Sequence, residues 1–179
     1  MNYHNITYPD MNNGSGLRVV LWLSGCSHKC QGCQNPQTWD ANSGIPFDES
    51  AKEELFRELD KDYISGLTLT GGDPLHEANL DGVLDLVNKI RLSCPQKSIW
   101  LYTGYIWEQL FEDDDFDIQG GICENQTRRA IILSCDVLID GKYIDSLQDI
   151  TLPYRGSKNQ RVINIKESIK KNEIILYSN

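Results

Sequence analysis

The sequence predicts an α/β fold in which parallel strands alternate with helices in a single domain. Three observations predict it. The length of 179 residues suits one domain. Short apolar runs alternate with amphipathic segments. Glycine and polar residues follow directly after several of those runs, as at the ends of strands. Strands separated by segments of helical length are typical of a parallel sheet.

The first half of the chain holds three predicted strands and two predicted helices. The strands are the apolar runs at residues 18–23, 67–70 and 99–102. Asp48 is expected to cap a helix that ends near Leu59, because apolar residues between them recur at i, i+4 and i+8. A second helix is predicted from the stripe formed by Leu80, Val83, Leu84, Val87 and Ile90.

The pattern is weaker in the second half. A short helix is predicted around Trp107 and Leu110, and the acidic segment 112–127 is expected to be a loop or an insertion. Residues 131–133 fit either the end of a helix or a strand. The remaining elements are strands at 137–139 and 162–165, a polar helix near 166–171, and a last apolar run at 174–177 within a C-terminal tail, 166–179.

Charge and hydropathy exclude two classes of partner. Twenty-six acidic against 17 basic residues give a net charge of -9, which repels phosphate backbones, so no nucleic-acid partner is expected. The longest apolar run, residues 19–23, is far shorter than the ~20 residues of a membrane-spanning helix. The polar first five residues lack the regions of a signal peptide. We therefore expect a cytoplasmic protein without a membrane partner.

Cysteine is the informative residue type. Cys26, Cys30 and Cys33 lie within eight residues, while the other three, Cys94, Cys123 and Cys135, are scattered. Without an export signal, such a cluster favours metal or redox chemistry over disulfides. Three thiolates spaced C-x3-C-x2-C can hold an iron–sulfur cluster and leave one iron open. An open metal position is a binding site.

Two alternatives for the cysteines stay open. One is a structural zinc site completed by His28 or by a distant cysteine, although zinc sites normally combine two paired elements and only one is present. His28 is otherwise expected to be an exposed loop residue. The other is a non-catalytic electron carrier, whose cluster needs a fourth thiolate from one of the scattered cysteines. Those cysteines are otherwise interpreted as small buried or incidental thiols.

Three further motifs follow the ends of predicted strands, as the cysteine cluster does. They are Gly71-Gly72-Asp73-Pro74, Thr103-Gly104 and Asp140-Gly141. In parallel α/β folds ligands bind at the carboxyl edge of the strands. One ligand is therefore expected to contact all of these motifs.

These motifs resemble those of a known family. The spacing of the three clustered cysteines is the signature of the radical S-adenosylmethionine (SAM) superfamily, and residues 71–74 resemble its glycine-rich motif for the amino group of SAM. Gly32 departs from the aromatic residue usual in the superfamily. More narrowly, the chain resembles the activating proteins of the anaerobic, class III ribonucleotide reductases, in register from Tyr3 to about Val162, through residues 14–18, 33–40, 70–75, 100–105 and 155–160.

The resemblance implies a fold and an activity. The fold is an incomplete parallel (β/α) barrel of the radical SAM type. The activity is reductive cleavage of SAM at a [4Fe-4S] cluster, followed by removal of a hydrogen atom from a glycine in the large subunit of the reductase. The electron donor is expected to be a flavodoxin-type protein. An activase of another glycyl radical enzyme, of the formate-lyase type, is the alternative, although those chains are commonly longer.

The resemblance also implies roles for individual residues. Cys26, Cys30 and Cys33 would ligate the cluster. Three residues would present backbone carbonyls to the ammonium group of SAM, namely Gly71, Gly72 and Asp73. The backbone at Gly32 and Gln34 would lie against the adenine. Further candidates for the pocket wall are Asn35, Thr103, Arg155 and Asn159, with Arg155 suited to pair with a carboxylate.

Overall fold

The computed structural model describes residues 1–111 and 123–178. Within them, seven strands form one open sheet in the order β3-β1-β2-β4-β5-β6-β7. The strands are β1 Asn2–Asp10, β2 Leu17–Leu23, β3 Ile45–Pro46, β4 Ile64–Gly71, β5 Ser98–Tyr102, β6 Val137–Asp140 and β7 Arg161–Asn164. The α-helices are α1 Glu49–Leu59, α2 Leu80–Ser93, α3 Trp107–Phe111, α4 Cys123–Leu133 and α5 Ile165–Lys171.

Only the centre of the sheet is parallel. Strands β2, β4, β5 and β6 pair in parallel, whereas β1 pairs with β2 and β3, and β6 with β7, in antiparallel fashion. The expectation of a parallel sheet is therefore wrong at both edges. The physical reason lies in the connections between strands. Residues 11–16, between β1 and β2, are too few for a crossover, which needs a dozen or more residues. Residues 141–160, between β6 and β7, contain only the short 3-10 helix Asp145–Leu147.

The sequence pattern located most central elements. All three strands predicted in the first half are present as β2, β4 and β5, and both helices as α1 and α2. Residues 131–133 end helix α4. Residues 123–127, expected in the acidic loop, instead begin α4, and the rest of that segment, 112–122, lies outside the described residues. The last apolar run makes only a single bridge, between Leu176 and Ile163.

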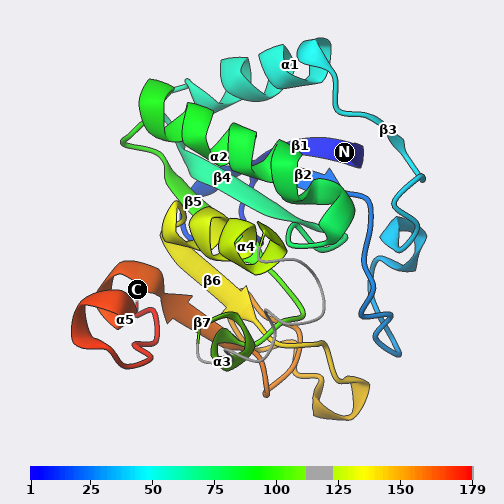
Figure 1. The fold of residues 1–179 in the computed structure, drawn as a ribbon, viewed down its shortest axis with the longest axis vertical. Helices are drawn as coiled ribbons and strands as arrows, with labels where there is room; N and C mark the ends of the chain where they lie inside the picture. Colours follow the sequence, from blue (N-terminus) through cyan, green and yellow to red (C-terminus); the bar gives the residue numbers. More distant parts are fainter. Residues whose placement is uncertain (112–122, 179) are drawn as a thin grey trace.

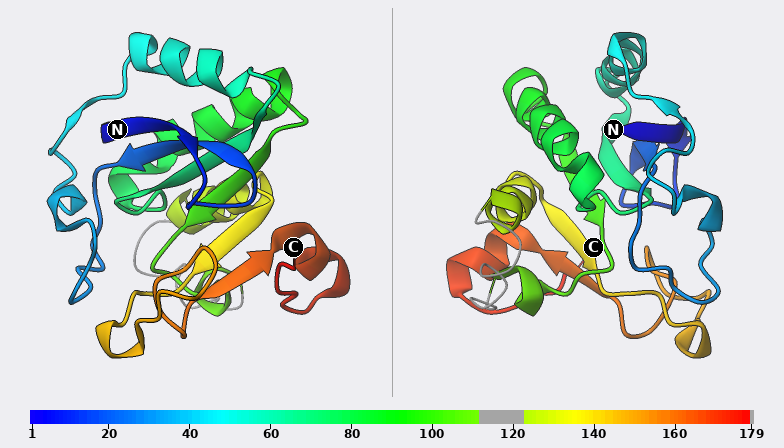
Figure 2. Two further views of the ribbon diagram at one scale, coloured as in Figure 1. Left: turned by 180° about the vertical axis from the view of Figure 1, so that it is seen from behind. Right: turned by 45° about the vertical axis from the view of Figure 1, so that its right-hand side comes forward.

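Helices α1, α2 and α4 lie along one face of the sheet (Figure 1; Figure 2, right). Alternate residues of β2, Val19, Leu21 and Leu23, point to this face and join its apolar core. The opposite face carries a smaller apolar cluster around Trp100 and the buried side chain of Arg18. None of the helices in the described part of the chain has the length and apolar character needed to cross a membrane.

The N-terminal cap of α1 is Asp48, and its contribution to stability can be predicted. The Asp48 side chain accepts a hydrogen bond from the backbone N–H of Ala51 at 3.0 Å. Asp48→Ala is expected to lower the free energy of unfolding by about 1 kcal/mol, because a backbone donor loses its acceptor. Urea unfolding under argon measures the change. Asp48→Asn, which keeps a capping oxygen, should lie close to the parent, and equal losses in both variants would contradict the capping role.

Candidate metal centre

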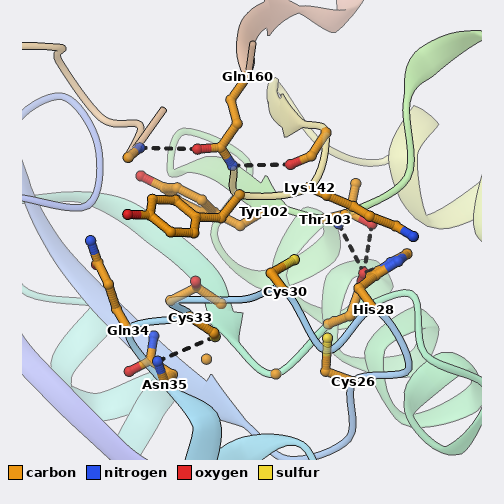
Figure 3. Close-up of a pocket in the computed structure, with 18 of the residues that line it drawn as sticks. Cys26, His28, Cys30, Cys33, Gln34, Asn35, Tyr102, Thr103, Lys142 and Gln160 are labelled. Atoms are coloured by element: carbon orange, nitrogen blue, oxygen red, sulfur yellow. Dashed lines mark hydrogen bonds and ion pairs between the residues drawn. The ribbon is translucent and has the colours of Figure 1, made fainter. Parts of the chain in front are cut away.

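A cavity of about 230 Å³ opens at the carboxyl ends of the four parallel strands. Figure 3 shows the three clustered cysteines on one side of it and Lys142 and Gln160 on the opposite side. The structure thus brings together motifs that are far apart in the sequence. Of the predicted site residues, those that line the cavity are Cys26, Cys30, Cys33, Gln34, Asn35, Gly71, Gly72, Asp73 and Thr103.

Three predicted residues do not line this cavity: Gly32, Arg155 and Asn159. Gly32 has φ +73°, a conformation that favours glycine, and a Cβ there would lie 2.5 Å from Oδ1 of Asp145 in the loop after β6. The Asn159 side chain donates to the carbonyl of Lys142 at 2.8 Å. Arg155 has no carboxylate partner among the described residues.

Backbone hydrogen bonds shape the cysteine loop. The N–H groups of Gly25 and Cys26 donate to the carbonyls of Thr38 and Trp39, at 2.7 and 3.0 Å. Gly25 has φ +94°, a conformation that favours glycine. At the other end of the loop, the N–H of Asn35 donates to Sγ of Cys33 at 3.4 Å. The loop is therefore anchored to the segment that follows it, and its three thiols are free and partly exposed.

The donor set fits an iron–sulfur cluster. Three thiols on one loop line one cavity, and each thiolate of a cuboidal cluster binds a different iron. A zinc site instead needs four ligands around a single ion. Within the described residues, no three His, Cys, Asp or Glu side chains are arranged to hold one ion. Burial, reinforced by the Asp73 carboxylate, raises the pKa of Cys26 to about 11, so a metal would have to displace its proton.

Asp73 joins three loops at the cavity. Its carboxylate is almost completely buried and accepts hydrogen bonds from the Thr103 hydroxyl at 2.9 Å and the Gly104 N–H at 3.0 Å. The same oxygen lies 2.8 Å from Nε2 of His28 in the cysteine loop. The Asp73 carbonyl already accepts from the N–H of His76 and the Asn79 amide, both at 3.0 Å. Of the three expected carbonyls, those of Gly71 and Gly72 therefore remain for an ammonium group.

The expectation that His28 is an exposed loop residue is wrong. Its side chain is 8% exposed and its ring packs edge-on against Tyr105, with centroids 4.7 Å apart. A Cβ on Gly104 would lie 2.3 Å from the His28 ring, so this glycine makes room for the imidazole. Contacts between loops that follow different strands cannot be read from residue spacing, so this contact was not predictable.

This packing predicts an effect of His28→Ala on the cluster. Loss of the imidazole removes the link between the cysteine loop and Asp73, so a reconstituted cluster should be lost to a chelator about tenfold faster, in line with outer residues of metal sites. Absorbance at the cluster band under argon follows the loss. His28→Gln keeps a polar side chain that can reach the Asp73 carboxylate and is expected to recover part of the lifetime. A cluster in His28→Ala as long-lived as the parent's would contradict this role.

Several residues that line the cavity were not predicted from the sequence as site residues, and Lys142 and Gln160 are two of them. Lys142 follows Asp140-Gly141, whose position at a strand end was noticed, and Gln160 ends the segment 155–160. The Gln160 side chain accepts from the N–H of Gly156 and donates to the carbonyl of Gly141, both at 3.0 Å. The Gln160 side chain therefore holds Gly156, in the loop after β6, close to Gly141 at the end of β6. In this way the segment 155–160 shapes the wall of the cavity.

Comparison with known proteins adds independent information. A family model described as "4Fe-4S single cluster domain" matches residues 12–163. The anaerobic ribonucleoside-triphosphate reductase-activating protein of Escherichia coli K12 is 39% identical over 168 residues, covering 93% of this chain and 100% of that protein. The Vibrio cholerae protein of the same name is 41% identical, covering 89% and 96%. The Enterobacteria phage T4 protein of that name is 40% identical, covering 97% and 100%.

Proposed function

Because the chain belongs to the family of anaerobic ribonucleoside-triphosphate reductase-activating proteins and contains a 4Fe-4S single cluster domain, we propose that it is a radical SAM enzyme that generates a glycyl radical on that reductase. The observation that carries the proposal is the shared cavity. Three thiols and the Gly71-Gly72 backbone face one space at the carboxyl edge of the parallel strands. That placement suits a ligand held between a cluster and a backbone wall.

Cys26, Cys30 and Cys33 would hold a [4Fe-4S] cluster and leave its fourth iron to SAM. When bound, the cluster would supply one electron to the sulfonium of SAM, whose bond to the 5' carbon would break to leave methionine and a 5'-deoxyadenosyl radical. That radical would take a hydrogen atom from a glycine of the large subunit of the reductase, which would give 5'-deoxyadenosine and a glycyl radical. The proposal also includes an electron donor of the flavodoxin type. The fold that we propose is the incomplete (β/α) barrel, which is supported by the open sheet with its cavity at the carboxyl ends of the strands.

The glycine motif sits where it can bind the ammonium group. A Cβ on Gly72 would lie 2.5 Å from the carbonyl oxygen of Gly25, directly before Cys26. Glycine thus lets the motif pack against the start of the cysteine loop, and SAM would bridge the two. Such fixed placement of reactants supplies much of the acceleration of a demanding step. On the other wall, Gln34 and Tyr102 would lie against the adenine.

The electron-carrier alternative receives no support from the described cysteines. Cys94 and Cys135 are buried in the apolar core and do not line the cavity, so neither thiol is placed to be a fourth ligand of a cluster there. The Cys123 side chain lies outside the described residues. The names of the relatives favour the anaerobic ribonucleotide reductase over another glycyl radical enzyme as the protein that is activated.

Anaerobic reconstitution with iron and sulfide tests the proposal. After addition of dithionite and SAM, we expect 5'-deoxyadenosine by chromatography. After addition of the anaerobic reductase, we expect a glycyl radical signal by electron paramagnetic resonance. A protein that carries a full cluster yet forms no 5'-deoxyadenosine, with or without reductase, would overturn the proposal. A spectrum unchanged by SAM would point to the electron carrier.

A further inference from the structure

We propose that a groove beside the cavity binds an extended segment of the reductase, the one that carries the glycine to be activated. We call it the peptide groove; its volume is about 460 Å³ and its lining includes Met11, Asn12, Gln34, Ile150, Pro153 and Arg155. The inference rests on the proposed function and adds the surface through which the macromolecular substrate enters.

The groove is continuous with the cavity. Asn13, Gln34, Tyr102 and Gly156 line both. Hydrogen transfer needs the reacting atoms within about 3–3.5 Å of each other, so the glycine of a macromolecule must enter the cavity on its own chain. The segments on either side of that glycine need a surface at the cavity mouth, and the peptide groove provides one.

The groove exposes apolar side chains that nothing in the described chain covers. Met11 is 72% exposed and Ile150 is 92% exposed. Ile150 belongs to the loop after β6, drawn in gold in Figure 1, which projects beyond the end of the sheet and also exposes Ile144 and Leu147. Met11, Ile150, Leu152 and Pro153 line this groove together, and a contiguous apolar patch with a polar rim, unlike a single exposed residue, is typical of a protein interaction site.

One unpaired donor in the groove, on Arg155, matches an acceptor of a peptide backbone. Nε of Arg155 is buried and has no hydrogen-bond partner among the described residues. Leaving a buried donor unpaired is unfavourable, so a ligand that brings an acceptor would gain from pairing with it. Among the described residues, the groove lining contains Arg155 and no acidic side chain, although the chain carries a net charge of -9. The segment that fits has an apolar side chain for Ile150 and Met11 and a carbonyl or carboxylate oxygen for Arg155.

The test uses the reconstituted protein and the intact anaerobic reductase. Ile150→Asp and Met11→Asp are compared with Leu92→Asp, a matched control whose side chain is 85% exposed at the end of α2 and outside the groove. We expect each groove variant to weaken binding to the reductase at least tenfold by titration calorimetry, and the control to change it less than twofold. The yield of glycyl radical at limiting reductase should fall in parallel with binding.

Cleavage of SAM without reductase separates this inference from the proposed function. Ile150→Asp and Met11→Asp should form 5'-deoxyadenosine at the parental rate, and unfolding midpoints show that they fold. Parental affinity for the reductase in both variants would overturn the peptide groove while leaving SAM cleavage intact. Parental affinity together with loss of self-association would assign the surface to a second copy of the chain and also overturn it. A parent that cleaves no SAM would instead refute the proposed function.

Discussion

Alanine in place of Cys26, Cys30 or Cys33 is expected to abolish 5'-deoxyadenosine formation, to below about 1% of the parent. Each of these thiols would hold a different iron, so removing one leaves the cluster with a second bare corner or prevents its assembly. A loss of 100-fold or more corresponds to at least about 2.7 kcal/mol of activation free energy. The measurement is product per protein after anaerobic reconstitution with dithionite and SAM, together with iron content.

Cys94→Ala is the matched control for these variants. Cys94 caps the end of α2, is 4% exposed, and does not line the cavity. Its loss should therefore cost some packing energy while leaving iron content and product unchanged. Two results would contradict the assignment: product from a variant of any clustered cysteine, or loss of the cluster in Cys94→Ala, which would reveal a fourth protein ligand.

The meeting of several sequence motifs at one cavity was predictable, because it follows from the direction of the parallel strands alone. The cysteine loop, Gly71-Gly72-Asp73 and Thr103 each follow a strand of the parallel centre, and parallel strands end at one edge. The helices α1 and α2 were predictable for a similar reason, since a cap and an apolar stripe are local features. The incomplete barrel stays a prediction.

Features that depend on contacts between distant loops were not predictable. Strand β1 buries Tyr3 and Ile6 among polar residues, so its pattern is too weak to identify a strand. His28 is buried only because Gly104, after β5, leaves space for its ring. Gly32 looks like a residue for ligand approach, but the structure shows that its space is taken by Asp145. In each case the decisive neighbour lies far away in the sequence.

Arg18→Leu is expected to lower the free energy of unfolding by about 3–5 kcal/mol, because several acceptors that pair with its guanidinium inside the protein lose their donor. Arg18 is completely buried on the face of the sheet opposite to the main helices. Burial lowers the pKa of Arg18 to about 10, still far above neutral pH, so the guanidinium is charged at pH 7. Urea unfolding of the reconstituted protein under argon measures the loss, with Arg18→Lys as the comparison.

The size of this effect follows from what leucine would leave behind. Replacing a whole buried ion pair by apolar residues is often harmless, because both charges disappear together. Arg18 differs, since its Nη atoms donate to the carbonyls of Ser15, Leu67 and Ser98, at 3.2, 2.6 and 3.0 Å. Its other bonds go to the hydroxyls of Thr68 and Ser98, at 2.6 and 3.0 Å, and within residues 1–111 and 123–178 none goes to a carboxylate.

Leucine at position 18 would therefore leave several acceptors without a donor in the interior. Each acceptor that stays buried and unpaired lowers the free energy of unfolding by about 1–3 kcal/mol. Lysine keeps the charge but offers only three donors from a single nitrogen, so Arg18→Lys should fall between the parent and Arg18→Leu. The guanidinium also lies 5.2 Å from the centre of the Trp100 ring, a contact that leucine cannot replace electrostatically. A free energy of unfolding for Arg18→Leu within about 1 kcal/mol of the parent's would contradict this role. It would show that water or a shift of β5 satisfies these carbonyls, and that Arg18 is dispensable for joining β2, β4 and β5 beneath the cavity.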